Sequence, residues 1–163
     1  MKYFAYGSNM SIHRIQQRII NSKFIGVYSL KGYDLRFHKV GQDSSAKCDA
    51  FNTNTDFDCV EGVVFEINHD DISSLDKIEG VANGYEKIDV NVIGTNNENI
   101  LAFMYAATNI NESLLPYDWY KKNILEGAKS AGLSPSYIKK IKRISSLKDP
   151  DKSRSKLEAE IYK

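Results

Sequence analysis

The sequence predicts an α+β domain with a mixed, barrel-like sheet, and two observations lead to this fold class. Strand-like and helical segments are interspersed along the 163 residues, without regular βα units or a glycine-rich nucleotide fingerprint. Hydrophobic residues make up 42% of the chain and charged residues 26%, a composition that lets one domain of this length bury a core. We therefore expect one domain over residues 1–145, followed by a charged tail over residues 146–163.

Short apolar and aromatic runs that alternate with polar residues predict strands through most of the first half of the chain. The first strand covers residues 2–6 and ends at Gly7, and apolar residues at helical spacing predict a helix over residues 11–20. Further strands are expected over residues 24–30, 33–37, 48–51 and 60–67, with a polar loop over residues 39–46.

A helix that begins after Asn68 has the clearest start and stop signals in the chain. Asn68 is a favourable N-cap, and two aspartates follow it in the first turn. We expect the apolar residues Ile72, Leu75 and Ile78 to face the core, and Gly80 to end the helix.

The second half of the chain predicts a hairpin followed by helices. Residues 85–93 and 100–107 alternate between apolar and polar, and the stretch between them is rich in turn residues. Helices are expected over about 117–130 and 135–145, the second with Ser134 as N-cap and Pro135 at its first position. The tail is expected to be partly disordered, with a short helix over residues 155–162.

Charge and composition exclude several classes of protein. The 22 basic and 21 acidic residues give a net charge of +1, which provides no general attraction to nucleic acid or anionic membrane. No apolar run is long enough to span a bilayer, and the first residues lack a signal-peptide core, so a cytoplasmic protein is expected.

Cysteine and histidine usage gives no sign of a metal site. The three histidines are scattered, and Cys48 and Cys59 lie in no pair or cluster with metal-ligand spacing. We expect no metal and no histidine-dependent triad. The two thiols are expected to be free, as in most cytoplasmic proteins, although the sequence alone leaves a disulfide open.

The segment Tyr3-Phe4-Ala5-Tyr6-Gly7-Ser8-Asn9 predicts a strand that ends in a loop just before a helix. Such a turn can point successive backbone N–H groups at one anionic oxygen, and its glycine lets a ligand approach the backbone closely. The alternative is an ordinary strand-to-helix turn in which Ser8 or Asn9 helps to cap the helix. Taken alone, the short Gly-Ser-Asn pattern favours that alternative.

Glu79 occupies the last turn of its helix, where the helix dipole is negative. That field, together with desolvation by apolar neighbours, should disfavour the charged carboxylate. A general acid or base that works near neutral pH needs tuning of this kind. The alternative is a solvated glutamate that is merely tolerated at a helix end, and Glu79 alone would favour it.

Four of the ten tyrosines fall at positions that can face inward: Tyr6, Tyr85, Tyr105 and Tyr120. Buried tyrosine hydroxyls can hold a polar ligand inside an otherwise apolar pocket. The alternative is core filling, with each hydroxyl reaching a backbone carbonyl.

Taken together, these residues resemble the γ-glutamylcyclotransferase family within the AIG2-like superfamily. The opening Tyr-Phe-Ala-Tyr-Gly-Ser-Asn resembles the family's glycine-serine-asparagine loop. Residues 75–81 with Gly84-Tyr85 resemble a second family block, and Tyr105 and the Tyr120 region resemble later ones. The resemblance covers residues 2–145 in consistent order.

The resemblance implies a small mixed β-barrel flanked by helices, and the intramolecular cyclisation of γ-glutamyl-amino acids. The products would be 5-oxoproline and a free amino acid or amine, with no cofactor, and relatives suggest a homodimer. By position, the resemblance implies that Glu79 is the catalytic acid/base. The candidate substrate-binding residues are Tyr3, Phe4, Ala5, Tyr6, Gly7, Ser8, Asn9, Tyr85, Tyr105 and Tyr120.

Residues 38–50 depart from the family pattern, which has a glycine-rich turn and an Ala-Thr strand at this place. This departure leaves the leaving group open among an amino acid, an amine such as that of a γ-glutamylamine, and the dipeptide released from glutathione. A function of another class also stays open: the chain would be a non-catalytic small-metabolite binder on the same scaffold.

Overall fold

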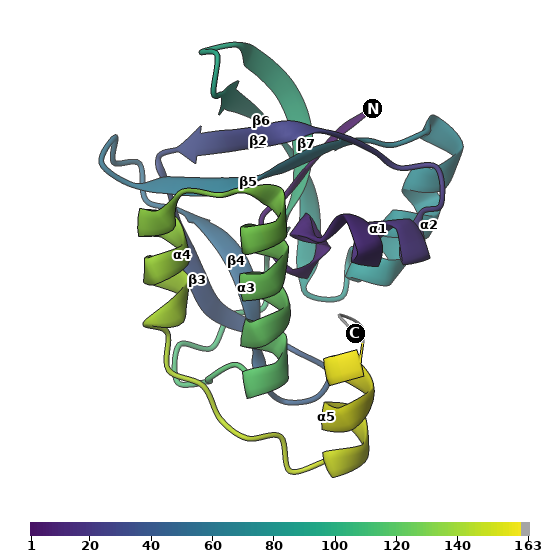
Figure 1. Cartoon of the computed structure of the whole chain (residues 1–163), viewed down its shortest axis with the longest axis vertical. Coiled ribbons are helices and arrows are strands. Elements are labelled where there is room, and N and C mark those ends of the chain that lie inside the picture. The colour runs from purple at the N-terminus through teal and green to yellow at the C-terminus, as the bar shows by residue number, and fades with distance from the viewer. Residues whose placement is uncertain (161–163) are drawn as a thin grey trace.

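A closed five-stranded barrel forms the centre of the computed structural model, which describes residues 1–160 (Figure 1). Neighbouring strands follow the order β1-β5-β2-β6-β7. One pair is parallel, with Tyr3 of β1 opposite Phe103 of β7, and this pair closes a barrel that is otherwise antiparallel. The α+β class and the mixed barrel are therefore confirmed. The barrel strands are β1 (Lys2–Ala5), β2 (Lys23–Lys31), β5 (Cys59–Glu66), β6 (Tyr85–Gly94) and β7 (Asn99–Ala107).

Strands β3 (Tyr33–Val40) and β4 (Ala46–Asn52) form a separate two-stranded sheet below the barrel in Figure 1. The polar loop that we expected over residues 39–46 shrinks to residues 41–45, because tertiary contacts extend both strands. The N–H of Val40 donates to the carbonyl of Asn109 at 2.9 Å, and the N–H of Ala46 donates to the carbonyl of Leu115 at 3.0 Å.

Helices cover the barrel and the small sheet from two sides (Figure 1). Helices α1 and α2 lie together on one side, and α3 and α4 lie beside β3 and β4. Tyr120 of α3 contacts Cys48 of β4, and Lys140 of α4 contacts Asp34 of β3. No helix within residues 1–160 is long and apolar enough to cross a membrane. The helices are α1 (Ile12–Arg18), α2 (Ile72–Glu79), α3 (Asp118–Ala131), α4 (Pro135–Lys142) and α5 (Lys152–Ala159).

Helix α2 begins later than the sequence suggests. Residues 69–71 form a short 3-10 turn, and the side chain of Asn68 makes no capping hydrogen bond. Ile72 and Leu75 are buried as expected, but Ile78 is 45% exposed, so its predicted place in the core is wrong. At 100° per residue Ile78 rotates away from Ile72, whereas Glu79 returns to the face that Leu75 occupies.

Two predicted helix boundaries are confirmed. Gly80 ends α2 with a left-handed φ of 77°, a conformation that costs glycine little. Ser134 caps α4, its hydroxyl accepting a hydrogen bond from the N–H of Tyr137 at 3.2 Å.

Gly62 lets β1 and β5 pack closely around the ring of Phe4. A β-carbon at residue 62 would lie 2.6 Å from the carbonyl oxygen of Ala5 and 2.7 Å from the Phe4 ring. Phe4 is fully buried. A glycine in the interior of this strand is therefore explained by the close approach of neighbouring groups.

The C-terminal segment packs against α3 over its described residues. The indole N–H of Trp119 donates a hydrogen bond to the carboxylate of Asp149 at 2.7 Å. The guanidinium of Arg154 donates two more to the same carboxylate, at 2.7 and 2.6 Å. Partial disorder was expected here, and a helix over 155–162. The helix instead lies at Lys152–Ala159, and residues 161–162 are outside the described part. The division of the chain at residue 145 stays a prediction.

We expect this attachment of the C-terminal segment to weaken in acid. Hydrogen bonds from Arg154 hold the pKa of Asp149 well below its usual range. Because the folded-state pKa is lower than the unfolded value of about 3.9, the carboxylate stabilises the fold above that value, and this stability is lost as the pH falls through the folded pKa. Asp149→Asn should therefore unfold more easily at neutral pH, and its deficit relative to the wild type should shrink below about pH 4.

Thermal unfolding of both proteins from neutral pH to about pH 2 measures this deficit. Asp89→Asn, at an exposed position on β6, is the matched control for loss of one carboxylate. A deficit of Asp149→Asn that stays constant across the pH range would contradict the prediction.

Candidate active site

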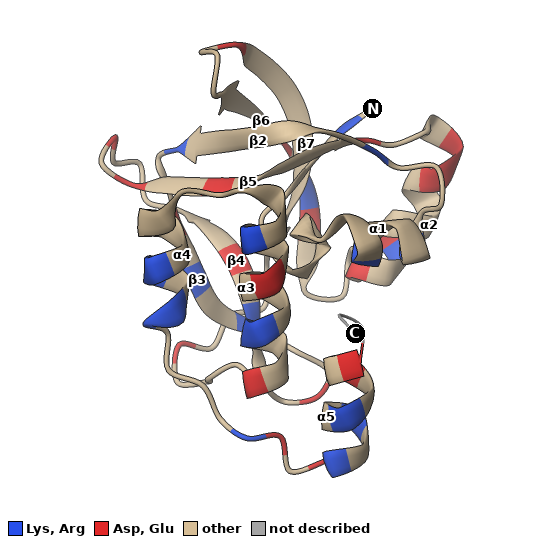
Figure 2. Ribbon diagram, in the orientation of Figure 1, with Lys and Arg blue, Asp and Glu red and all other residues tan. Residues whose placement is uncertain are grey.

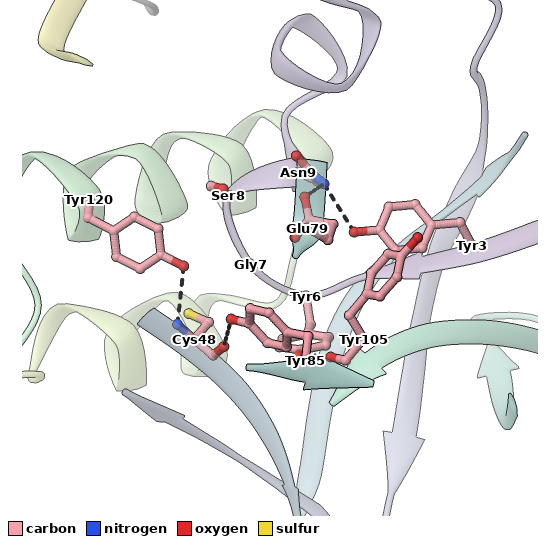
Figure 3. Close-up of a pocket in the computed structure, with 10 residues that line it drawn as sticks. All are labelled: Tyr3, Tyr6, Gly7, Ser8, Asn9, Cys48, Glu79, Tyr85, Tyr105 and Tyr120. Atoms are coloured by element: carbon pink, nitrogen blue, oxygen red, sulfur yellow. Dashed lines mark hydrogen bonds between the residues drawn. The ribbon is translucent and has the colours of Figure 1, made fainter. Parts of the chain in front are cut away.

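A narrow pocket at one end of the barrel brings together most of the residues that the sequence singles out (Figure 3). Its cavity volume is about 40 Å³. The strand-end segment, the end of α2, the starts of β6 and α3, and strands β4 and β7 all contribute to it. We call it the inner pocket, and its lining residues are Tyr3, Tyr6, Gly7, Ser8, Asn9, Cys48, Glu79, Tyr85, Tyr105 and Tyr120.

Two predicted substrate-binding residues do not line this pocket. Phe4 and Ala5 are buried in the barrel, and neither reaches the inner pocket or the larger cavity beside it. The alternation of side chains along β1 places Phe4 on the face opposite to Tyr3. Ala5 shares the face of Tyr3, but its single methyl group does not reach the pocket. Cys48 lines the pocket but was not predicted, because nothing local distinguishes it from a core cysteine.

Glu79 is paired with a cation that the sequence analysis did not identify. Its Oε1 atom accepts hydrogen bonds from Arg18 Nη1 at 2.7 Å and from Asn9 Nδ2 at 2.9 Å. The Glu79 side chain is 18% exposed. Its Oε2 atom makes no hydrogen bond to the described part of the chain, so one carboxylate oxygen remains open to a ligand.

The ion pair changes how the helix-end position of Glu79 should be understood. The sequence suggested an isolated carboxylate, but the structure places the Arg18 guanidinium against it at 2.7 Å. Arg18 is the last residue of α1, where a basic residue is common for local reasons. The one sequence signal for a role of Arg18 in the site was its position on the helix that directly follows the loop.

Asn9 connects the loop to Glu79 instead of capping a helix. Its side chain is buried, and Nδ2 donates to the Tyr3 hydroxyl at 3.1 Å as well as to Glu79. Its Oδ1 accepts from Arg18 at 2.8 Å. The cap of α1 is Ser11, whose hydroxyl accepts from the N–H of Arg14 at 3.3 Å. The capping alternative for Ser8 and Asn9 is therefore wrong.

The loop has free backbone donors at the pocket. Within residues 1–160, the N–H groups of Gly7 and Ser8 donate no hydrogen bond. Gly7 has a negative φ of −111°, so its conformation does not require glycine. A β-carbon at Gly7 would lie 3.4 Å from Cys48 Cβ and 3.8 Å from the Tyr120 hydroxyl, so the backbone approaches the far wall of the pocket closely.

The tyrosine hydroxyls are mostly bound to the protein, as their structural alternative predicted. Tyr85 donates to the Cys48 carbonyl at 2.6 Å, Tyr6 donates to the Tyr105 carbonyl, and Tyr105 donates to Asp76 at 2.7 Å. The Tyr120 hydroxyl instead accepts from the Cys48 N–H at 3.1 Å. These bonds make the wall rigid.

The inner pocket holds one carboxylate, and the tyrosines and the cysteine beside it keep their protons at neutral pH. Burial raises the pKa of Tyr3, Tyr6, Tyr85, Tyr105 and Tyr120 above the usual tyrosine value. Burial also raises the pKa of the Cys48 thiol, which makes it a poor nucleophile. Glu79 is the one carboxylate among the lining residues.

A larger cavity of about 380 Å³ adjoins the inner pocket. The two share Ser8, Glu79, Tyr85 and Tyr120, so Glu79 stands where one opens into the other. We call the larger space the outer cavity. Residues 1–160 contain no group of three or more His, Cys, Asp or Glu side chains placed to hold a metal ion, and Cys48 and Cys59 are both free thiols.

Known proteins match this chain over almost its whole length. Residues 59–141 match the AIG2-like family. γ-Glutamylcyclotransferases from Bos taurus and Homo sapiens are 37% and 36% identical to it, over 98% of this chain and 84% of each relative. A solved structure of a γ-glutamyl cyclotransferase superposes with a TM-score of 0.89 at 32% identity, covering 99% of this chain and 97% of that one. With the fold and site described above, these matches show that the chain belongs to the γ-glutamylcyclotransferase family.

Proposed function

We propose that this chain is a γ-glutamylcyclotransferase, which converts a γ-glutamyl-amino acid into 5-oxoproline and a free amino acid. The observation that carries the proposal is the position of Glu79. Its carboxylate is fixed through Oε1 by Arg18 and Asn9, and Oε2 is open to the pocket beside the free donors of the loop. Family membership supports the same reaction.

The reaction needs one group that first accepts and later returns a proton. The substrate's α-amine must attack its own γ-carbonyl, but an α-ammonium has a reference pKa of about 8 and is mostly protonated at neutral pH. Glu79 would take that proton through Oε2. The nitrogen then bonds to the carbonyl carbon, and the bond from that carbon to the leaving nitrogen breaks as Glu79 returns the proton to it. The ring nitrogen still carries one proton too many after the attack. It passes this proton to the freed Glu79 carboxylate, and the proton ends on the released amine as its ammonium form.

The remaining residues would bind and orient the substrate. Arg18 and Asn9 act as positioning residues that hold Glu79 in place. The N–H groups of Gly7 and Ser8 would hold either the substrate's α-carboxylate or the oxyanion that forms during attack. The rigid tyrosine wall would keep the glutamyl chain folded for ring closure. Effective molarities of well-oriented intramolecular reactions reach about 10⁵–10⁸ M, so holding the substrate in the right conformation contributes a large part of the rate.

The proposal is tested by measuring 5-oxoproline released from γ-glutamyl-alanine, from γ-glutamyl-lysine joined through the lysine ε-amine, and from glutathione. We expect release from γ-glutamyl-alanine. β-Aspartyl-alanine is the matched control, because its chain is one methylene shorter and would have to close a strained four-membered ring. Binding of γ-glutamyl-alanine without product, in a folded sample, would overturn the proposal in favour of a non-catalytic binder. Product only from γ-glutamyl-lysine or glutathione would move the leaving group to those classes.

Two further expectations accompany the proposed function. The family resemblance implies a homodimer, which size-exclusion chromatography with light scattering would test. Cytoplasmic location also stays a prediction.

A further inference from the structure

The outer cavity is the place where the leaving group of the substrate would lie. Glu79 stands between the inner pocket and the outer cavity, and both share the same serine and two tyrosines. If the glutamyl chain occupies the inner pocket, any group attached through the scissile nitrogen must extend past Glu79 into the outer cavity. The side chains of this cavity should therefore select the leaving group.

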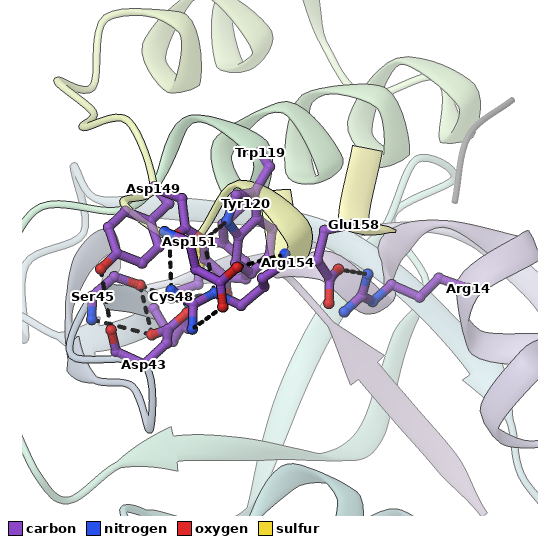
Figure 4. A network of polar contacts seen from close by, with 12 residues as sticks. Arg14, Asp43, Ser45, Cys48, Trp119, Tyr120, Asp149, Asp151, Arg154 and Glu158 are labelled. Atoms are coloured by element: carbon purple, nitrogen blue, oxygen red, sulfur yellow. Dashed lines mark hydrogen bonds and ion pairs between the residues drawn. The ribbon is translucent and has the colours of Figure 1, made fainter. Parts of the chain in front are cut away.

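Basic residues outnumber acidic residues six to three in the wall of the outer cavity, and most of the basic ones are already paired. Figure 4 shows two of these pairs, those of Arg14 and Arg154. Figure 2 shows lysine and arginine on α1 and α5, two of the elements that contribute to this wall. The pairs are Arg14 with Glu158, Arg18 with Glu79, Lys47 with Asp43, and Arg154 with Asp149. The remaining cations are Lys77 and Lys39, and neither makes an ion pair or side-chain hydrogen bond within residues 1–160. Lys77 is exposed to solvent, whereas Lys39 is only 7% exposed.

Lys39 lies in surroundings that are costly for a lone cation. Its ammonium nitrogen is 4.7 Å from the centre of the Tyr85 ring. Its chain runs along the backbone at Gly84, where a β-carbon would lie 2.9 Å from Lys39 Cε and 3.2 Å from Nζ. Burial and the neighbouring charge of Lys47 lower the pKa of Lys39. Buried charges in proteins are normally paired, but no carboxylate of the described residues lies within ion-pair distance of Lys39. Glu79 and Asp43 act on it only from farther away.

The ladder between β3 and β4 places a second lysine beside the first. Lys39 and Lys47 are directly opposite each other in the register, so their side chains project from the same face. Like charges at such positions destabilise a sheet. The Lys47 ammonium is held by Asp43 at 2.7 Å and lies 4.6 Å from the centre of the Tyr120 ring, so Lys39 is the one left open.

We propose that Lys39 binds the carboxylate of the leaving amino acid, and so makes the enzyme selective for γ-glutamyl-α-amino acids over γ-glutamylamines. This inference rests on the proposed function. In a γ-glutamyl-α-amino acid the carboxyl carbon is separated from the scissile nitrogen by a single carbon, which keeps the anion near the boundary that Tyr85 and Glu79 form. In γ-glutamylamines no carboxylate lies at this short distance from the scissile nitrogen, and in glutathione the carboxylate lies one residue farther out.

The experiment compares kcat/KM for γ-glutamyl-alanine with kcat/KM for γ-glutamyl-alaninamide, which differs only in the leaving group's charge. The wild type should prefer γ-glutamyl-alanine by on the order of 10-fold or more, as expected for a hydrogen bond between charged groups. Lys39→Met should bring the ratio close to one, chiefly by raising KM for γ-glutamyl-alanine. Lys39→Arg should restore part of the preference. Lys139→Met, at an exposed position on α4 outside both cavities, removes the same charge and should leave the ratio unchanged.

The outcomes separate this inference from the proposed function. Turnover of both substrates without discrimination by the wild type would overturn the role of Lys39 and leave the cyclotransferase function standing. An unchanged ratio in a folded Lys39→Met protein would do the same. Absence of 5-oxoproline from either substrate with folded wild type would overturn the proposed function, and this inference with it. The wild-type ratio needs no variant, so the inference is testable even if Lys39→Met fails to fold.

Discussion

Glu79→Gln should lower kcat for 5-oxoproline release by on the order of 10²–10⁴-fold, because the amide can neither accept the ammonium proton nor return it to the leaving nitrogen. The fold should be retained. Glutamine has the same shape, and its oxygen can still accept hydrogen bonds from Arg18 and Asn9. Steady-state kinetics with γ-glutamyl-alanine measures the loss, and calorimetry measures substrate binding by the inactive protein.

Glu86→Gln is the matched control for this prediction, since Glu86 is an exposed glutamate on β6. It should turn over substrate at the wild-type rate. Wild-type turnover by Glu79→Gln would sink the assignment of Glu79 as the acid/base. Lost turnover together with a lowered melting temperature would instead point to a structural role for the Arg18–Glu79 pair.

Leu75→Ala should destabilise the protein by about 2–5 kcal/mol, the usual range for removing a buried leucine side chain. Leu75 is fully buried and is one of the two buried residues of α2. It lies one helical turn before Glu79 and on the same face, so it holds the end of α2 against the barrel. Turnover should fall as well, because a shifted helix end would move the carboxylate away from the substrate.

Denaturant-induced unfolding gives the free-energy change, and 5-oxoproline release gives the change in kcat. Ile78→Ala is the matched control, because Ile78 lies on the same helix but is 45% exposed. Its stability should stay within about 0.5 kcal/mol of the wild type. Equal losses for the two variants would show that burial of Leu75 does not anchor α2.

Local signals in the sequence were sufficient for the fold class and for most elements. The hairpin of β6 and β7, the stop at Gly80 and the cap at Ser134 each depend on residues close together in the chain. Periodicity and turn chemistry act over such short distances, so they can be read without the fold. Failures came where packing overrides them, as at Ile78 and in the segment held by Asp149.

The candidate site divides in the same way. The loop from Tyr3 to Asn9 and the glutamate at the end of α2 form continuous motifs, and family resemblance linked them. The cation beside Glu79 comes from Arg18, which is 61 residues away in the chain. Lys39 of β3 and Lys47 of β4 can be recognised as a pair only from the strand register and from the cavity that both residues line. Charge pairing, burial and the walls of a cavity each depend on residues that are distant in sequence. They exist only once the barrel has closed, which is why the partner of Glu79 and the open charge of Lys39 had to be found in the folded protein.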